Sequence, residues 1–317
     1  MKDKTVVLNG GLVNYDGKVD YGQIASQVII HDTTPEDKII ERVQGFTVVV
    51  TKEMPLRGEV IRQFPESVKM ICEAGTGYNN IDLEAAREKE IIVCNIPAYS
   101  TERVAHTAVL LMLSLASSMQ KQMQMLAQGN HDNFHQHLMV DHVELNGKTL
   151  GVIGYGHIAK SLIKVAVALG MDVIVSTRTP RNDTAEVSFK SLEEVLKQSD
   201  FLSLNCPLND GTRHMINAKT LAMMKPSSYL INTARGGLVD EKALIEALNQ
   251  GTIAGAGLDV QEVEPLDDAS ALYRMDTVIL TPHMGWRGLE TRRRLVKLIG
   301  GNIKAFANGQ PINRVDS

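Results

Sequence analysis

The sequence predicts an α/β protein with two Rossmann-like or flavodoxin-like parallel sheets, each covered by helices. Short β-branched runs alternate with helical patterns, and this alternation stops near Cys94 and starts again at Thr149. A chain of 317 residues also exceeds what one ordinary core holds. Hydrophobic residues make up 44% of the chain and charged residues 22%, which is enough apolar material for two cores.

Two series of apolar runs supply the strands. The first series is Thr5–Leu8, Gln27–Ile30, Thr47–Val50, Lys69–Cys72 and Ile91–Cys94. The second series is Thr149–Ile153, Asp172–Val175, Phe201–Leu204, Ser228–Ile231, Ala256–Leu258 and Thr277–Leu280. Amphipathic segments such as Leu83–Lys89 lie between some of the runs. Apolar strands that alternate with helices are typical of βαβ units, in which the strands run parallel.

One long helix is predicted between the two series, from Thr101 to about Gln128, with Ser100 or Thr101 as its N-cap. Its apolar side consists of Val104, Ala108, Leu111, Leu115, Met119 and Met123. One interpretation is a buried interdomain helix. The other is that the Met-rich end forms part of a subunit interface.

A last helix is predicted over Leu289–Ala307, and we expect it to pack on the first domain. The Arg292–Arg294 run lies beside Glu290 in this helix, and the pattern favours a solvated helix face. The expected domains are therefore residues 1–100 with 288–317, and residues 101–287 with the helix over 101–128 as linker.

Charge and cysteine content exclude several classes of function. A net charge of −4 argues against nucleic acid or an acidic membrane as the main partner. Cys72, Cys94 and Cys206 form no CxxC pair, which favours a reducing cytoplasm over a disulfide framework. No signal-peptide core follows Met1, and the longest apolar stretch is too short for a bilayer.

The segment Gly129–His142 has a polar composition and is predicted to be a solvated loop. It contains His131, His135, His137 and His142. These histidines have no cysteine nearby and no consistent helical spacing, so we expect no metal site.

A dinucleotide-binding fingerprint follows the strand Thr149–Ile153. Gly154 permits a tight turn, Gly156 lets a pyrophosphate approach the backbone, and Ala159 allows close packing of helix and strand. His157 and Ile158 open the helix, whose N-terminal N–H groups would bind the phosphates. This context predicts an NAD or NADP site.

Three further motifs lie at or just after strands of the second series. They contain Arg235 after Ser228–Ile231, Asp259 and Glu264 after Ala256–Leu258, and His283 after Thr277–Leu280. Ligands gather at the carboxyl ends of strands in open α/β sheets, so these loops can converge.

The three side chains suit the reduction of a 2-keto acid. The Arg235 fork can hold a carboxylate bidentately. His283 can protonate the carbonyl oxygen as hydride arrives, and a carboxylate at Glu264 favours the charged imidazolium. The trio therefore predicts an oxidoreductase that interconverts a small 2-keto acid and its 2-hydroxy acid.

At these residues the sequence resembles the D-isomer-specific 2-hydroxyacid dehydrogenase family over nearly the whole chain. The segments that carry the resemblance are Ala74–Asp82, Asn95–Pro97, Gly154–Ala159, Cys206–Leu208, Asn232–Gly237 and Thr281–His283. The resemblance implies an N-terminal substrate domain, closed by the C-terminal helix, around a central Rossmann domain. It also implies a homodimer.

The resemblance assigns roles to individual residues. Arg235 would bind the substrate, His283 would be the acid/base, and Glu264 would be its partner. Asp259 would face the nicotinamide carboxamide. The remaining cofactor contacts would come from Cys206, Pro207, Thr212, Thr233 and Ala234. The Thr76 and Gly77 N–H groups would bind the substrate carboxylate.

Within the family, Lys52, Thr76–Asn79 and His283–Trp286 are most similar to the glycerate dehydrogenase and hydroxypyruvate or glyoxylate reductase branch. This similarity adds Lys52 and Trp286 to the expected substrate contacts. Ala159 replaces the usual third glycine, His106 replaces an acidic or amide residue, and the usual Gly-x-Trp after the linker helix is missing.

Cofactor choice depends on the end of the second Rossmann strand. Family members that use NAD have an Asp there, but alignment from Gly170 places Thr177 at this position and Arg178 beside it. A guanidinium beside neutral hydroxyls favours the 2′-phosphate of NADPH. The alternative is that Arg178 points into solvent and Thr177 binds the ribose, which gives dual specificity.

Three other classes of protein have this architecture. A formate-type dehydrogenase has an amide where Glu264 stands, so the carboxylate favours acid/base chemistry. A D-lactate-type dehydrogenase would use NAD. A nucleotide-sensing corepressor would bind cofactor without turnover, and such proteins carry extra disordered arms. Here the expected folded elements extend to within a few residues of both ends of the sequence, which favours an enzyme.

Overall fold

A computed structural model describes residues 3–316, so that Met1, Lys2 and Ser317 lie outside the described residues. The chain divides into two compact units. Unit 1 is Met1–Ser100 with Trp286–Ser317, and unit 2 is Thr101–Gly285. The second boundary lies two residues earlier than the expected one, because Trp286 packs in the core of unit 1.

Unit 1 is built on a five-stranded parallel sheet with the order β2-β1-β3-β4-β5. Its strands are β1 (Lys4–Val7), β2 (Gln27–Ile30), β3 (Val48–Thr51), β4 (Met70–Glu73) and β5 (Ile92–Cys94). Its α-helices are α1 (Ile39–Arg42), α2 (Gly58–Ile61), α3 (Leu83–Glu88) and α11 (Leu289–Ala307), and its 3₁₀ turns are Gly10–Leu12 and Glu36–Lys38. This order is the flavodoxin-like arrangement.

Alternate residues of these strands face two separate cores. Val48, Val50 and Cys72 pack with Leu295 and Ile299 of α11 on one face of the sheet. The other face packs against α1, α2 and α3. The C-terminal helix therefore covers a sheet whose strands all come from the first hundred residues, as we expected.

The basic run in α11 is not a fully solvated face. Arg292 is buried, donates to the Val13 carbonyl at 2.8 Å and pairs with both carboxylate oxygens of Asp16 at 2.8 and 2.7 Å. Its guanidinium also lies 4.3 Å from the Tyr15 ring centroid. The solvated-face prediction was wrong for Arg292, because a fixed carboxylate and carbonyl replace water around the buried fork.

Unit 2 is built on a seven-stranded parallel sheet with the order β12-β11-β10-β9-β6-β7-β8. Its strands are β6 (Thr149–Ile153), β7 (Asp172–Ser176), β8 (Ser188–Phe189), β9 (Phe201–Leu204), β10 (Tyr229–Asn232), β11 (Gly255–Leu258) and β12 (Val278–Leu280). The chain direction across the sheet reverses between β6 and β9. Ligands bind at such a switch point in doubly wound sheets.

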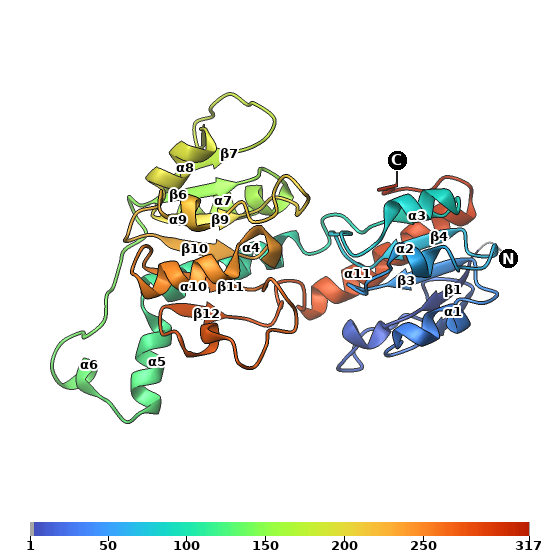
Figure 1. Ribbon diagram of the computed structural model, residues 1–317, viewed down its shortest axis with the longest axis horizontal. Helices are drawn as coiled ribbons and strands as arrows, with labels where there is room; N and C mark the ends of the chain where they lie inside the picture. Colours follow the sequence, from blue (N-terminus) through green and yellow to red (C-terminus); the bar gives the residue numbers. More distant parts are fainter. Residues whose placement is uncertain (1–2, 317) are drawn as a thin grey trace. The chain divides into compact units, whose positions relative to one another are not determined.

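Helices cover both faces of this sheet (Figure 1). One face packs against α4 (Thr101–Ala116) and α7 (His157–Ala168), and the other against α8 (Leu192–Gln198), α9 (Ala218–Leu221) and α10 (Glu241–Asn249). The 3₁₀ turns of unit 2 are Gly236–Leu238 and Ala271–Arg274. The prediction of two parallel-sheet α/β domains is confirmed.

The prediction of a single long helix over residues 101–128 was wrong. The structure has two helices, α4 and α5 (Met119–Ala127), separated at Ser117 and Ser118. Ser118 adopts a left-handed φ of 47°, and its hydroxyl donates to the Asp141 carbonyl at 2.7 Å. This contact with a residue downstream in the chain redirects the helix.

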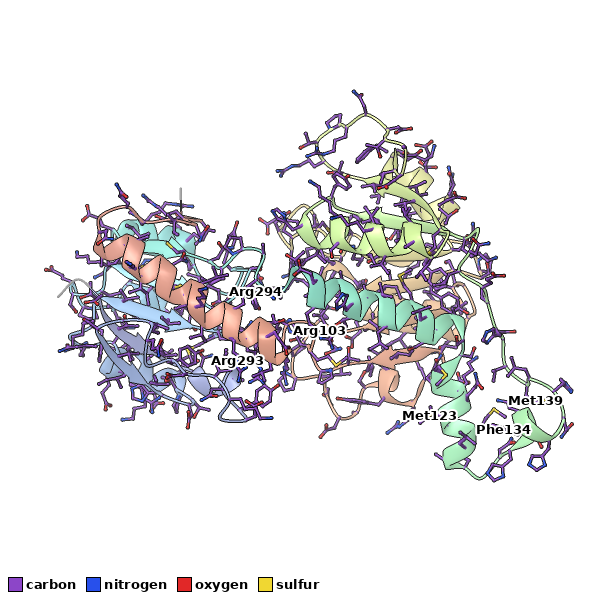
Figure 2. All side chains as sticks on the ribbon, turned by 180° about the vertical axis from the view of Figure 1, so that it is seen from behind. Arg103, Met123, Phe134, Met139, Arg293 and Arg294 are labelled. Atoms are coloured by element: carbon purple, nitrogen blue, oxygen red, sulfur yellow. The ribbon has the colours of Figure 1, made fainter. Side chains whose placement is uncertain are left out.

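After the break the apolar side is no longer buried. Leu111 and Leu115 are in the core, whereas Met119 and Met123 are exposed. Helix α5 and the short helix α6 (Asp132–His135) form an arm that projects from the rest of unit 2, and Met123, Phe134 and Met139 lie on it (Figure 2). The predicted loop over Gly129–His142 thus contains one helical turn. Within residues 3–316, no helix has the length and apolar run needed to span a bilayer.

Candidate active site

The dinucleotide loop joins β6 to α7. Gly154 has a φ of +97°, and a Cβ there would lie 2.5 Å from the Asn205 carbonyl oxygen, so this position requires glycine. A Cβ at Gly156 would meet nothing within 4 Å, so the space in front of the helix is open. Helix α7 begins at His157, and its N-cap residue is Gly156. Glycine has no side chain that could bond to the N–H groups of the first turn. The N–H groups in the first turn of α7 can therefore donate hydrogen bonds to a phosphate.

Two buried polar atoms, which follow the neighbouring strands β9 and β10, have no hydrogen-bond partner among the described residues. They are Thr233 Oγ1 and Asn205 Oδ1. A buried polar group without a partner is costly, so these atoms fit a site that a polar ligand completes. The Gly154 turn lies against Asn205 and the Cys206 N–H, which places Asn205 at the same strand edge.

The other predicted cofactor residues lie on two loops. The Thr212 hydroxyl donates to the Pro207 carbonyl at 2.7 Å, which closes the turn after Cys206. Burial raises the pKa of Cys206 to about 11, so this side chain is a neutral thiol. The Ala234 N–H donates to Asn232 Oδ1 at 3.1 Å and fixes the start of the Arg235 loop. These residues fit a nicotinamide dinucleotide.

Three loops carry the predicted catalytic residues past the carboxyl ends of β10, β11 and β12. The register pairs Asn232 with Leu258, and Leu258 with Leu280, so the three strands end level with one another. A Cβ on Gly236 would lie 1.8 Å from the Gln261 carbonyl oxygen, which shows that the first two loops touch. The sheet therefore brings the loops of Arg235, Glu264 and His283 to one edge.

His283 and Glu264 contact each other through a hydrogen bond. His283 Nδ1 lies 2.8 Å from Glu264 Oε2, and the two side chains are 17% and 35% exposed. Glu264 Oε1 accepts the Gln261 N–H at 3.1 Å, which orients the carboxylate. The contact to Nδ1 assigns proton exchange with a substrate to Nε2.

Asp259 holds the loop on which His283 lies. Its buried carboxylate accepts the Thr281 hydroxyl at 2.6 Å, the Met284 N–H at 2.9 Å and the Gly285 N–H at 2.8 Å. Burial raises the pKa of Asp259 above its ordinary value, although these hydrogen bonds oppose the change. His283 itself has a left-handed φ of 48°, so its conformation depends on this support.

Arg235 is half-buried and extended at the end of its loop. Its Nη1 donates to the Ala234 carbonyl at 2.8 Å, and its own carbonyl accepts Asn232 Nδ2 at 2.9 Å. The first contact orients the guanidinium, and the second fixes the backbone of Arg235 relative to β10.

The end of β7 carries the predicted cofactor-specificity residues. Thr177 directly follows this strand and is half-buried, and Arg178 is exposed. The Arg181 guanidinium lies 5.4 Å from the ring centroid of Tyr155 in the dinucleotide loop, and Lys160 Nζ lies 5.1 Å from the same centroid. Two further cations therefore lie beside the loop.

In unit 1, Lys52 and Trp286 contact each other. The Lys52 ammonium is 2% exposed, pairs with the Glu53 carboxylate and lies 4.2 Å from the Trp286 ring centroid. Burial alone would lower the pKa of Lys52, but Tyr99, Glu53 and Glu73 together raise it. Lys52 is thus a buried cation, packed against the loop that begins at Gly75.

Thr76 and Gly77 lie on the loop after β4, and Thr76 is exposed. The Thr76 hydroxyl donates to the Ile96 carbonyl at 3.0 Å, and Asn95 Nδ2 donates to the Thr76 carbonyl at 2.7 Å. These contacts orient the Thr76–Gly77 peptide.

The sequence analysis did not assign Asn205 or Glu73. Both are polar residues at the carboxyl end of an apolar strand, Asn205 after β9 and Glu73 at the end of β4. The strand-end rule that selected Arg235 and His283 applies equally to them.

Fold and site together define the class of nicotinamide-dinucleotide oxidoreductases. The family described as "D-isomer specific 2-hydroxyacid dehydrogenase, NAD binding domain" matches residues 109–285. The chain belongs to this family. It is an NAD(P)-dependent enzyme that acts on 2-keto and D-2-hydroxy acids.

Similar proteins point to one branch of the family. A hydroxypyruvate reductase of Blautia hydrogenotrophica is 34% identical over 99% of both chains, and a glycerate dehydrogenase of Methylorubrum extorquens is 38% identical over 90% of both chains. A solved glyoxylate/hydroxypyruvate reductase of Sinorhizobium meliloti, in complex with NADP and malonate, is 27% identical with a TM-score of 0.85 and covers 99% of this chain and 97% of its own. These findings confirm the predicted branch.

Proposed function

We propose that the enzyme reduces glyoxylate to its achiral 2-hydroxy acid, or hydroxypyruvate to its D-2-hydroxy acid, with NADPH preferred over NADH. The observation that carries the reaction is the 2.8 Å contact between His283 Nδ1 and Glu264 Oε2 at the strand edge that also carries Arg235. The names of similar proteins support these two substrates, since both are small 2-keto acids.

The tasks of this reaction are divided among the residues of the site. Arg235 binds the substrate carboxylate through its planar fork. The Thr76 and Gly77 N–H groups of unit 1 also bind a carboxylate. A bound reduced nicotinamide would supply the hydride that C2 of the keto acid accepts. His283 donates a proton from Nε2 to the carbonyl oxygen, and Glu264 stabilises the imidazolium before transfer. Asp259 keeps His283 in place and retains acceptor capacity for the nicotinamide carboxamide.

The preference for NADPH rests on the end of β7. Thr177 stands where a carboxylate would repel a 2′-phosphate, and Arg178, with Arg181 and Lys160 nearby, supplies positive charge. Phosphate contacts by guanidinium groups are strong and bidentate. The pyrophosphate would lie on Gly154, Gly156, His157 and Ile158, and the nicotinamide end on Thr233, Ala234 and the Cys206–Thr212 loop.

We also propose a cytoplasmic homodimer. The arm of α5 and α6 exposes six apolar side chains, which is unusual for a monomer surface: Met119, Met123, Leu126, Phe134, Leu138 and Met139. Phe134 is 76% exposed. Cys72 on β4 and Cys94 on β5 are neighbours in the sheet register, yet both are free thiols. Neighbouring free thiols fit a reducing compartment. Light scattering of the purified protein tests the dimer.

Initial rates test the reaction and the cofactor together. Glyoxylate, hydroxypyruvate, pyruvate and a bulky keto acid are each assayed with NADPH and with NADH. The proposal expects the highest kcat/KM for glyoxylate or hydroxypyruvate with NADPH. Preferred pyruvate with NADH would instead indicate a D-lactate-type enzyme.

A further inference from the structure

A buried carboxyl group in unit 1 lies between two loops. Glu73 is the last residue of β4 and has no exposed surface. Its Oε1 accepts the Glu53 N–H at 2.9 Å, and its Oε2 accepts Asn80 Nδ2 at 3.0 Å. Glu53 belongs to the turn after β3, and Asn80 to the loop after β4. One side chain therefore joins the two loops.

The same two loops are also joined on either side of this contact. Asn80 Nδ2 donates a second hydrogen bond, to the Met54 carbonyl, at 2.9 Å. The Leu56 N–H donates to the Asn80 carbonyl at 2.8 Å. Glu53 has a left-handed φ of 55°, which is strained for a residue other than glycine, so its turn needs support.

Glu73 also lies beside the Gly75 end of the substrate loop. A Cβ on Gly75 would lie 3.1 Å from Glu73 Oε1 and 3.5 Å from Lys52 Nζ. The carboxyl group and the buried ammonium thus fill the space behind Gly75. The next residues along the chain are Thr76 and Gly77, whose peptide is fixed from its far side by Asn95.

We propose that Glu73 is a positioning residue for substrate binding: its buried carboxyl group ties the Lys52–Leu56 turn to the Gly75–Ile81 loop and so fixes the Thr76 and Gly77 N–H groups. The proposal rests on the proposed function of those two N–H groups. Glu73 does not touch the substrate itself.

Glu73→Gln tests this role with almost no change of size. One amide oxygen can still accept the Glu53 N–H, but the amide nitrogen then faces Asn80 Nδ2, which is also a donor. Asn80 cannot turn to correct this without losing its bond to Met54. A buried donor left without an acceptor typically costs enough to change an equilibrium by about tenfold.

We expect KM for the keto acid to rise about tenfold, while kcat at saturation and the dissociation constant of NADPH stay near wild type. Asn80→Ala removes the partner from the other loop and should raise KM similarly, with a double variant no worse than either single one. Glu88→Gln is the matched control, because Glu88 pairs with Arg62 on the surface of the same unit. Wild-type KM in folded Glu73→Gln or in Asn80→Ala would overturn the proposal.

Hydrogen exchange separates this proposal from the proposed function. Amides of residues 75–81 should exchange faster in Glu73→Gln than in wild type or Glu88→Gln, whether or not a keto acid is reduced. Faster exchange in a protein with no keto-acid turnover would support the link while refuting the proposed function. Unchanged exchange in this loop would refute the positioning role, even in an active enzyme.

Discussion

Replacing Asp259 by Asn should separate support of the His283 loop from binding of nicotinamide. Oδ1 accepts both the Thr281 hydroxyl and the Met284 N–H, and Oδ2 accepts the Gly285 N–H. Asparagine can preserve the first two bonds, but its amide nitrogen then faces the Gly285 N–H. One hydrogen bond to a charged group is lost, which is worth about 1.5–3 kcal/mol.

The expected loss lies at the lower end of that range. Burial raises the pKa of Asp259, so a neutral amide recovers part of the cost of burying the charge. A loss of about 1.5 kcal/mol should lower the Tm of a unit of this size by roughly 3–6 °C. Release of His283 from its left-handed conformation should lower kcat about a hundredfold, which is the typical effect of a misplacement near 1 Å.

Calorimetry measures the Tm, steady-state rates give kcat, and fluorescence titration gives the dissociation constant of NADPH. Asp172→Asn, at an exposed position of the same unit, is the control. If Asp259→Asn weakens NADPH but leaves the Tm unchanged, the carboxylate acts on the cofactor and not on the loop. Unchanged Tm and kcat would refute the reasoning for loop support.

Five further substitutions test other parts of the protein. His283→Ala should lower kcat by about 10²–10⁴-fold with cofactor binding intact, and Glu264→Gln should move the alkaline limb of the reduction profile to lower pH; an unshifted limb contradicts the pairing. Arg235→Lys keeps the charge but loses the fork, so kcat/KM for keto acids should fall strongly while the dissociation constant of the cofactor stays constant; near-normal kcat/KM would place carboxylate binding elsewhere. Arg178→Ala should weaken NADPH about tenfold to a hundredfold and leave NADH unchanged, and a wild-type enzyme with higher kcat/KM for NADH would contradict this assignment. Burial raises the pKa of Glu73 from 4.5 to about 7, so its neutral form stabilises the fold at low pH and this contribution is lost as pH rises through 7; Glu73→Gln should reduce the fall in Tm between about pH 5 and pH 8, and an identical fall in both proteins would refute it.

Predictions from the sequence succeeded where the signal is local or follows from topology. Apolar runs located β6 and β9 to the residue, because fully buried parallel strands carry a continuous hydrophobic pattern. The two-residue strand β8 carries too few residues for any pattern, and it was missed. The strand-end rule found Arg235 and His283, because parallel strands deliver their loops to one edge.

The failures have a different origin, since each depends on a partner far away in the sequence. The apolar pattern of Thr101–Gln128 continues through Ser118, but the helix ends where the Ser118 hydroxyl bonds to Asp141 and the Ala116 carbonyl accepts the Val143 N–H. The run of basic residues predicted that Arg292 faces solvent. Its carboxylate partner Asp16 lies 276 residues away in the sequence, so the local pattern could not indicate the buried contact. Periodicity and residue type indicate the secondary structure and the solvent exposure that one segment prefers. They do not indicate which distant segments contact each other.

Asp259 shows how this distinction affects the site itself. Family resemblance assigned it to the cofactor, and the structure adds three hydrogen bonds that hold the loop of His283. These bonds come from residues 22 to 26 positions downstream, beyond the next strand, so no local pattern indicates them. A carboxylate has about four acceptor positions, and three are used by the loop. Asp259 can therefore serve loop and cofactor together, and the Asp259→Asn variant measures each role with a separate assay.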